Sequence, residues 1–391
     1  MQRSVSLLCW IPLLAACGET PVLFQAEEPQ AFEALPEAPE TDVAFRTCDP
    51  GLRIDEGGCS ALVVEDLEDG VPSLYVVDGE SGYAARLVKL SGTFPTAGQV
   101  AVSPNGHEIA YVTYESGWQL YRMDLWTQEP QHLATLVGGT QPGQPTWSPD
   151  GKSLAFVSYD VGGAKWEIST VDLDGNVQSI DAFTITGSDI PRVRPTFSPD
   201  GESLAYAAFL GTEGVLRIAN VATGEVQTVF DPPGAVPLQR PVYDRSGEYL
   251  AVTYLAEDAW VVGRFDVRTR EIETLLELAL DAQPQVQWSP TDDTLAYLDV
   301  MKDDSAIALS VLTSELDSNT LDVVGPTFAA GHPAWSPDGS RVAYIRATDE
   351  GTAELVSVRV ADESRKVLRQ QAGPTRIGRP QWLGRRTYAA D

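Results

Sequence analysis

The side chains best suited to chemistry in this chain recur at one position of an internal repeat. In each of seven repeats, the residue immediately before a short strand-like segment is glutamine, arginine or histidine. Arginine can give a carboxylate two parallel hydrogen bonds, and glutamine can donate or accept. The set therefore suits an anionic or polypeptide ligand, and its members are Gln99, Gln144, Arg194, Arg240, Gln285, His332 and Arg379.

The absence of acidic residues from this set contrasts with the rest of the sequence. The chain holds 56 Asp and Glu against 27 Lys and Arg, and its formal net charge is −29. Such an excess argues against binding to nucleic acid or directly to anionic lipid. Two interpretations of the seven residues stay open. They recognise a ligand, or they cap a channel through hydrogen bonds to neighbouring backbone and water.

Motifs typical of catalytic or metal centres do not occur in the sequence. It contains no Gly-x-Ser-x-Gly, no His-Glu-x-x-His, no Walker loop and no Cys-x-x-Cys. His107 and His132 are expected at the surface. The recurring Asp-Gly pairs are interpreted as hairpin turns, because they lack the carboxylate density of a calcium loop. We therefore expect no catalysis, no cofactor and no metal site.

The elements that would position these residues are indicated by a repeated phrase. Its clearest copies, Trp147–Gly151, Phe197–Gly201 and Trp335–Gly339, read Trp/Phe-Ser-Pro-Asp-Gly and continue into an apolar segment. Looser copies cover residues 102–106, 243–247, 288–292 and 381–384. The serine position recurs every 45 to 50 residues. A period in this range is typical of four-stranded propeller blades.

One copy illustrates the blade that we expect. Residues 145–148 form a short first strand, and the Pro-Asp-Gly that follows forms a tight turn. The second, third and fourth strands are expected at Leu154–Ser158, Trp166–Asp172 and Val177–Ile180. No stretch shows sustained helical periodicity. The sequence therefore predicts an all-β fold in which the aromatic residues of the phrase fill the spaces between blades.

The two ends of the repeat region supply the remaining blade. Three segments have the pattern of second, third and fourth strands: Ala61–Glu65, Leu74–Asp78 and Ala84–Leu90. Arg379–Tyr388 has the pattern of a first strand, although Tyr388–Ala390 could instead act as a second strand that competes with Leu62–Val64. Pairing of the two ends would close a seven-bladed propeller of four-stranded antiparallel blades, with six blades as the alternative.

The repeat also places the seven polar residues at one face of the ring. In a propeller, the loop that leads into each first strand opens beside the central channel, so these side chains should surround the channel mouth. Loops between second and third strands open on the same face. They are acidic here, so we expect an acidic rim around the mouth, made of residues 65–66, 68–69, 257–258, 303–304 and 349–350.

The phrase Trp-Ser-Pro-Asp-Gly-x-x-[Leu/Val]-Ala-[Tyr/Phe], followed by hairpins such as Asp172–Gly175 and Val221–Glu225, resembles the repeat of TolB-type propellers over residues 60–391. The same repeat occurs in periplasmic scaffolds, in peptidase companion domains and in lyases, so the resemblance implies a fold more than a function. TolB-type rings have six blades and an N-terminal α/β domain. This sequence has seven repeats and no room for such a domain.

The first residues resemble a bacterial lipoprotein signal peptide, residues 1–16. A basic start precedes the apolar run Val5–Ala15, which is too short to span a bilayer. The sequence Leu-Ala-Ala-Cys that ends at Cys17 resembles a lipobox, so we expect Cys17 to carry a lipid anchor. Gly18 is compatible with sorting to the outer membrane. An ordinary signal peptide cleaved nearby is the alternative.

Residues 17–47 are expected to form a flexible tether, because they are rich in proline and acidic residues. Cys48 and Cys59 follow. They are the remaining cysteines once Cys9 is cleaved away and Cys17 is acylated. In an oxidising compartment we expect them to form a disulfide that closes the loop 48–59.

These features together predict a monomeric lipoprotein of the bacterial cell envelope, whose propeller at residues 60–391 binds another envelope protein or a peptide at the channel mouth. The lipid anchor would be its only contact with a membrane, and no nucleic acid partner is expected. The alternatives are a lyase or hydrolase that acts on an acidic saccharide, and a purely structural surface protein.

Overall fold

The computed structural model describes residues 61–68, 71–79, 82, 84–90, 100–125, 127–136, 145–160, 165–184, 194–210, 213–231, 239–256, 258–279, 284–300, 306–325, 333–348, 352–372 and 379–384. These residues belong to one compact unit, Pro39–Asp391, and form strands and turns without a helix. The predicted signal peptide, the tether and the residues Cys17, Cys48 and Cys59 lie outside the described residues, as does the segment Tyr388–Ala390.

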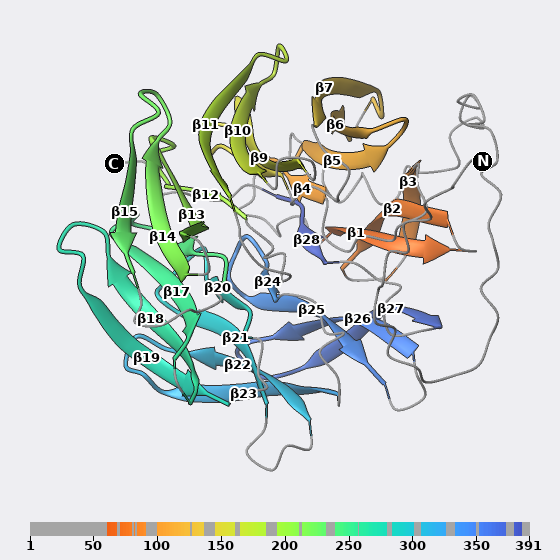
Figure 1. The fold of residues 1–391 in the computed structure, drawn as a ribbon. Coiled ribbons are helices and arrows are strands. Elements are labelled where there is room, and N and C mark those ends of the chain that lie inside the picture. The colour runs from red at the N-terminus through yellow and green to blue at the C-terminus, as the bar shows by residue number, and fades with distance from the viewer. Residues whose placement is uncertain are drawn as a thin grey trace, which may run out of the picture. The chain divides into compact units, whose positions relative to one another are not determined.

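Seven four-stranded antiparallel sheets surround a central channel, and we call them blades A to G (Figure 1). Blade A contains β28 (Gln381–Trp382), β1 (Ala61–Glu68), β2 (Val71–Asp78) and β3 (Ala84–Lys89). Blade B contains β4 (Val100–Val102), β5 (Glu108–Tyr114), β6 (Trp118–Asp124) and β7 (Pro130–Leu136). Blade C contains β8 (Thr146–Trp147), β9 (Ser153–Asp160), β10 (Lys165–Asp172) and β11 (Val177–Thr184).

The remaining four blades follow the same order from the channel outward. Blade D contains β12 (Thr196–Phe197), β13 (Ser203–Leu210), β14 (Glu213–Asn220) and β15 (Val226–Phe230). Blade E contains β16 (Val242–Tyr243), β17 (Tyr249–Leu255), β18 (Trp260–Asp266) and β19 (Ile272–Leu278). Blade F contains β20 (Val286–Trp288), β21 (Leu295–Val300), β22 (Ile307–Leu312) and β23 (Ser318–Gly325). Blade G contains β24 (Ala334–Trp335), β25 (Arg341–Ala347), β26 (Thr352–Arg359) and β27 (Arg365–Ala372).

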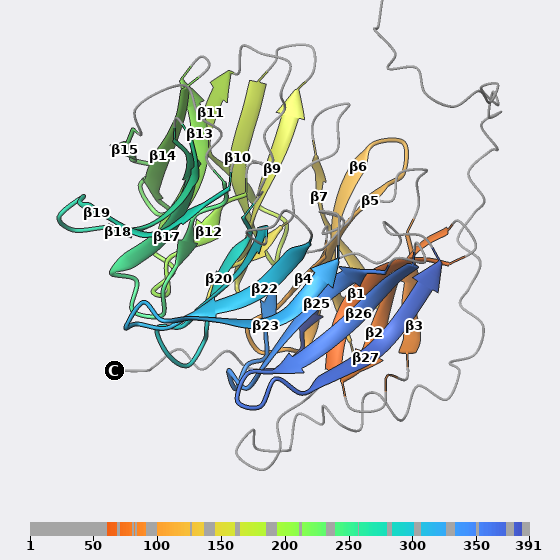
Figure 2. The same cartoon turned by 90° about the horizontal axis from the view of Figure 1, so that it is seen from below.

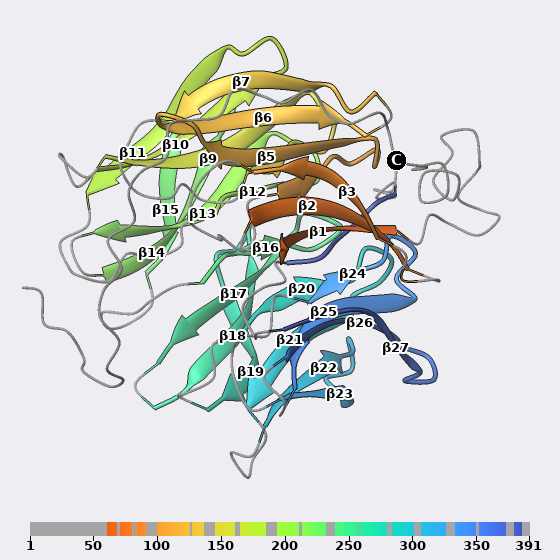
Figure 3. The ribbon, with the colours of Figure 1, turned by 90° about the vertical axis from the view of Figure 1, so that its right-hand side faces the viewer.

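Blade A is built from both ends of the described chain. β28 pairs antiparallel with β1, and the register sets Leu62 opposite Trp382 and Val63 opposite Gln381. Figures 2 and 3 show the result, with the orange strands of blade A beside the blue strands of blade G. The predicted seven-bladed fold and its closure by terminal strands are confirmed, and the six-bladed alternative is wrong.

The repeated Ser-Pro-Asp-Gly forms the turn from the first to the second strand. In blade C, Ser148 Oγ donates to Asp150 Oδ1 at 2.7 Å and accepts from the amide of Ser153 at 3.0 Å. Gly151 has φ +70°, a value that costs glycine little. Burial would raise the pKa of Asp150, but hydrogen bonds from Ser148 and the amide of Lys152 outweigh it, and the pKa is lowered. The carboxylate therefore stays charged and holds the turn.

The same turn in blade E exchanges the two polar residues. Asp244 stands where blades B, C, D, F and G have serine, and Ser246 stands where they have aspartate, asparagine or threonine. Ser246 Oγ donates to Asp244 Oδ2 at 2.5 Å, and the amide of Tyr249 donates to Asp244 Oδ1 at 3.0 Å. The hydrogen-bond pattern is kept although the residues that make it are reversed.

The hydrophobic core consists of layers between neighbouring blades. One layer joins Trp166 and Phe183 of blade C to Leu204 and Tyr206 of blade D, all of which are buried. Trp147 of the repeated phrase lies in the equivalent layer between blades B and C. The predicted role of the aromatic residues of the phrase as spacers between blades is therefore confirmed.

Every blade also carries a β-bulge between its third and fourth strands. In blade C, Ile168 faces Asp181 and Ser169 faces Ser179, so Ile180 is the extra residue. A bulge redirects the side chains that follow it. At this position it leaves Ile180 buried and lets Asp181 reach the next blade.

Candidate functional site

A cavity of about 180 Å³ occupies the central channel. Its wall contains the first strands of blades A, B, C, E, F and G, together with the residues that enter and leave them. At one end lie the residues before the strands, such as Arg240 and Gln285, and at the other end lie turn residues such as Pro104 and Pro337. The cavity therefore runs along the length of the first strands.

Three of the seven predicted mouth residues line this cavity: Arg240, Gln285 and Arg379. Arg194 is buried, but it is not among the lining residues. Gln99, Gln144 and His332 lie outside the described residues. Arg379 is also buried at the channel wall, whereas Arg240 and Gln285 are half-buried. The structure thus places three residues of the predicted set on one cavity wall, whereas Arg194 is buried and is not part of that wall.

The charge of the cavity wall differs from that of the whole chain. Among the described residues, its arginines are Arg240, Arg245 and Arg379, and its one carboxylate is Asp244. Both oxygens of Asp244 already accept hydrogen bonds, from Ser246 and from the amide of Tyr249. Amide side chains from Gln239, Gln285, Gln287 and Gln381 complete the polar part of the wall. On the described part of the wall, cationic side chains therefore outnumber carboxylates, in a protein whose net charge is −29.

The turns between first and second strands pack against one another at the far end of the channel. A methyl group added to Gly106 would lie 2.5 Å from the backbone nitrogen of Gly384, and one added to Gly247 would lie 3.1 Å from Pro199 Cδ. Both glycines have φ +75° to +77°, which disfavours a side chain, and at Gly106 the close backbone of Gly384 leaves no space for one. The guanidinium of Arg245 donates to the backbone oxygen of Thr291 at 3.0 Å in this ring of turns.

Tryptophans of the repeated phrase connect neighbouring first strands around the channel. The indole Nε1 of Trp147 donates to the backbone oxygen of Ala101 at 3.0 Å, and that of Trp335 donates to Gln287 at 2.9 Å. Trp382 bonds the backbone oxygen of Ala334 in the same way, at 2.9 Å. These contacts satisfy carbonyl groups that face the seams between blades. They also hold the wall of the channel in place.

The same connection is missing at Trp288 of blade F. Its indole Nε1 is buried and has no hydrogen-bond partner among the described residues. The same holds for Oγ1 of Thr253, a fully buried residue on β17 of blade E. Both residues line the cavity. The sequence analysis did not identify them, although the departure of residues 243–247 from the repeated phrase was a signal that blade E differs.

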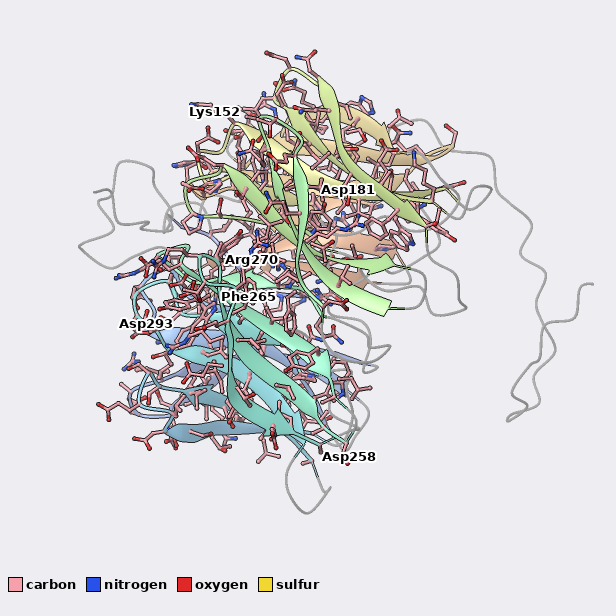
Figure 4. All side chains as sticks on the ribbon, turned by 60° about the vertical axis from the view of Figure 1, so that its left-hand side comes forward. Lys152, Asp181, Asp258, Phe265, Arg270 and Asp293 are labelled. Carbon is pink, nitrogen blue, oxygen red and sulfur yellow. The ribbon has the colours of Figure 1, made fainter. Side chains whose placement is uncertain are left out.

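Polar clusters between blades were also missed. Tyr206 donates to Asp181 Oδ2 at 2.8 Å, and Arg217 donates to the same oxygen at 2.7 Å (Figure 4 labels Asp181). Burial, and then the nearby negative charge of Asp181, raise the pKa of Tyr206, so the phenol remains a donor. At the next such seam, Asp322 accepts from Tyr344 and Arg365. These clusters lie away from the channel and serve to join blades.

The predicted acidic rim is wrong at its first member. Glu65 and Asp66 lie within β1 and are buried, because pairing with β2 continues as far as Glu68 opposite Val71. Asp66 accepts a hydrogen bond from Arg369 at 2.5 Å. Asp258 is exposed, and Figure 4 shows it at the opposite ends of the blades from Lys152 and Asp293. The other predicted rim residues, apart from Glu68, lie outside the described residues.

The two described histidines lie at the surface, as predicted. His107 is half-buried in the turn before β5, and its amide donates to Asn105 Oδ1 at 2.9 Å. His132 is exposed on β7, where its ring nitrogen lies 2.8 Å from Gln119 Oε1. Within the described ranges, no three His, Cys, Asp or Glu residues are arranged to hold a metal ion. That part of the chain also contains no helix that could cross a membrane.

Comparison with known proteins establishes the fold. No family model matches the sequence, and no curated protein matches it. Among solved structures, TolB from Acinetobacter baumannii is 18% identical, with a TM-score of 0.54 and coverage of 84% of both chains. The chain has a TolB-like propeller fold. At this identity the similarity establishes the fold and leaves the function open.

Enzymes share the same propeller. An oligogalacturonate lyase from Vibrio parahaemolyticus is 15% identical over 74% of this chain and 83% of its own, with a TM-score of 0.59. A puromycin-hydrolyzing peptidase from Mycobacterium tuberculosis is 18% identical over 80% of this chain, with a TM-score of 0.60. This chain spans about half the length of that peptidase, of which 54% is covered. The TolB-like fold is therefore found in proteins of several functions.

Proposed function

We propose that this protein is a non-catalytic lipoprotein of the bacterial cell envelope, and that its propeller binds a protein or peptide partner at the mouth of the central channel. The partner would present acidic groups or backbone carbonyls to the mouth residues. The protein would act as a monomer, held at the outer membrane by a lipid on Cys17 and a tether at residues 17–47, with Cys48 and Cys59 joined as a disulfide.

The observation that supports partner binding is the charge of the channel wall. The described residues of the wall include three arginines and one carboxylate, and that carboxylate already accepts hydrogen bonds from Ser246 and Tyr249. Charge-assisted hydrogen bonds to carboxylates are among the stronger polar contacts in proteins. Because the chain as a whole is strongly acidic, an anionic segment would be attracted to the channel more than to the rest of the molecule.

A lyase or hydrolase that acts on an acidic saccharide is the second candidate. The same arginines would bind a sugar carboxylate, and the oligogalacturonate lyases share this propeller. The sequence has none of the nucleophile–base motifs that hydrolases use. Incubation with acidic oligosaccharides, followed by chromatography of the products, separates the two. Cleavage that is lost with Arg240→Gln would replace the non-catalytic proposal.

Partner binding is tested by capture from envelope extract with the full-length chain that carries Cys17→Ser. This variant should itself move from the membrane fraction to the soluble fraction. The mouth variant combines Arg240→Gln with Arg379→Gln, and the control combines Arg268→Gln with Arg359→Gln, two exposed arginines outside the cavity. Each lost charge-assisted contact should weaken binding by about 1.5–3 kcal/mol.

The expected result is one partner that the control captures and the mouth variant does not. Raising the salt concentration should also weaken capture by screening the charges. Thermal unfolding of each variant shows whether the fold is retained. Equal capture by the mouth variant and the control would contradict binding at the channel mouth.

A further inference from the structure

Because the seven repeats align with one another, the molecule reveals which blade departs from the common pattern. At the fourth position of the apolar segment in the second strand, five blades carry buried apolar residues: Val112, Val157, Ala207, Leu298 and Ile345. Blade E has Thr253 there, and blade A has Glu65. Of these two, only Thr253 lines the channel.

Blade E departs at two further levels of the channel wall. Its first strand carries Tyr243 where blades C, F and G carry tryptophan. Its turn carries Asp244 and Arg245 in place of serine and proline. All three residues line the cavity, as does Thr253, so these four departures of blade E lie on the channel. Local departures from an otherwise consistent pattern are where functional sites are expected.

The seam between blades E and F also contains unsatisfied hydrogen-bonding groups. Within the part of the chain that the structure describes, Trp288 Nε1 and Thr253 Oγ1 have no partner, although both are buried. Equivalent tryptophans at three other seams do donate to the preceding blade. A buried donor without a partner destabilises the folded state. A ligand that accepts these hydrogen bonds would therefore be favoured at this seam.

The surrounding wall specifies the chemistry of that ligand. An indole nitrogen and a guanidinium only donate hydrogen bonds, and a hydroxyl can donate. Trp288, Arg240 and Thr253 all line the cavity, and the carboxylate of Asp244 is already engaged. The ligand group must then be an acceptor, and the arginine favours a negative one. A cavity of about 180 Å³ admits a carboxylate-bearing side chain or a small carboxylate.

We propose that the channel wall between blades E and F is a specific subsite that binds one carboxylate through Trp288, Thr253 and Arg240. The site rests on the proposed function in that the carboxylate is taken to belong to the partner segment. The shared chemistry is a carboxylate, whether it comes from a small acid or from an acidic side chain. The bound group would complete the hydrogen bonds that this seam lacks.

Nuclear magnetic resonance of the indole N–H groups tests the subsite in the full-length Cys17→Ser chain. The chain has nine tryptophans, and Trp288→Phe identifies the signal of interest by its loss. The probes are acetate, tetraglutamate and tetraglutamine, the last as an uncharged control. We expect saturable shifts of the Trp288 signal with acetate and tetraglutamate, and none with tetraglutamine.

Two substitutions connect the signal to the other residues. Arg240→Gln should raise the dissociation constants of both acidic probes about tenfold. Arg268→Gln, on the outer surface, should leave them unchanged. Thr253→Val removes an unpaired hydroxyl at constant shape, so it should raise the unfolding temperature of the free protein and weaken acetate binding. Thr135→Val, on the exposed outer strand β7, is the contrasting control, because Thr135 Oγ1 donates to Gln119 Oε1 at 2.8 Å and its loss should not raise the unfolding temperature.

Each outcome bears on the proposal. A Trp288 signal that neither acidic probe moves would overturn it, and so would a Thr253→Val variant that is less stable than the wild type. A signal moved by acetate while partner capture fails would keep the subsite and remove the proposed function. If partner capture depends on Arg379 but neither acidic probe shifts the Trp288 signal, the proposed function would stand and the subsite would be wrong.

Discussion

The seam between blades C and D and the seam between blades D and E use the same repeat position in opposite ways. At the first seam, the residue after the bulge is Asp181, which accepts hydrogen bonds from Tyr206 and Arg217 of blade D. At the second, it is Phe230, whose ring lies 5.5 Å from that of Tyr254 and 5.9 Å from that of Phe265. One seam is joined by a buried charge and the other by aromatic packing.

The difference shows how a repeat can keep its geometry while changing its energetics. Aromatic packing tolerates small shifts between blades, because dispersion and hydrophobic burial have little directionality. A buried carboxylate requires its donors at fixed distances, and it contributes stability only when they are in place. The polar seams therefore fix the relative position of two blades, and the apolar seams contribute burial.

Polar seams are concentrated toward the closing blade. The seam between blades F and G has Asp322 with Tyr344 and Arg365, and the seam between blades G and A has Asp66 with Arg369. The guanidinium of Arg369 also lies 4.6 Å from the ring centre of Tyr75. The two ends of the chain are thus joined by a strand pair and by a directional contact.

The largest effect is expected from opening the seam between blades G and A. Deletion of residues 381–391 removes β28, exposes the edge of β1 and takes Trp382 out of a buried layer. Cooperative thermal unfolding should be lost, as followed by calorimetry. Deletion of residues 18–45 should change stability by no more than about 0.5 kcal/mol. Equal transitions for the two deletions would refute closure by the terminal strands.

A smaller but still large effect is expected from Asp322→Ala at the seam between blades F and G. Its side chain is 1% exposed, and removal leaves Arg365 and Tyr344 without their acceptor. Breaking a buried ion pair on one side costs about 3–5 kcal/mol. Chemical denaturation measures the change in the free energy of unfolding.

Phe230→Ala at the apolar seam between blades D and E is the matched comparison. Phe230 is only half-buried, so its removal should cost about 2 kcal/mol, less than the range for a fully buried phenylalanine. If Phe230→Ala lowers the free energy of unfolding by more than Asp322→Ala does, the apolar seams contribute more stability than the polar ones, contrary to our expectation.

The smallest effect is expected from Tyr206→Phe at the seam between blades C and D. The substitution removes one of the two donors to Asp181 and leaves Arg217 in place. The cost should be about 1 kcal/mol, the usual net value of a hydrogen bond. Tyr159→Phe, on the partly exposed end of β9, serves as the control for loss of a phenol. A cost of several kcal/mol would mean that the phenol rather than the guanidinium fixes the carboxylate.

The sequence was sufficient to predict the blades and their closure. The serine position of the phrase recurs once per blade, and the segment Trp166–Asp172 alternates clearly enough to be assigned as a strand. The turn residues supported the assignment of the strands, because Pro149, Asp150 and Gly151 together favour a tight turn. Even the reversed turn at Asp244 was recognised from its position in the repeat.

The contacts between blades could not be predicted in the same way. Asp181 lies 25 residues from Tyr206 and 36 residues from Arg217, and a bulge shifts the register between them. The burial of Asp66 could not be predicted from the sequence either. Its acidic neighbours suggest a loop, and only the length of β1 shows that it lies within a strand. That Trp288 Nε1 and Thr253 Oγ1 find no partner among the described residues depends on the positions of neighbouring blades, which no local pattern encodes.

Because blade A contains strands from both ends of the described chain, it cannot be completed until the last strand, β28, has been synthesised. On a ribosome, β1 emerges early and must wait for β28 before it can pair, and Asp66 must wait for Arg369, 303 residues later. Blades B to G can form from neighbouring residues in the meantime. Until the last strand arrives, the growing protein is an open arc with an unpaired leading sheet, and a nascent chain that stalls late would expose that edge to other chains.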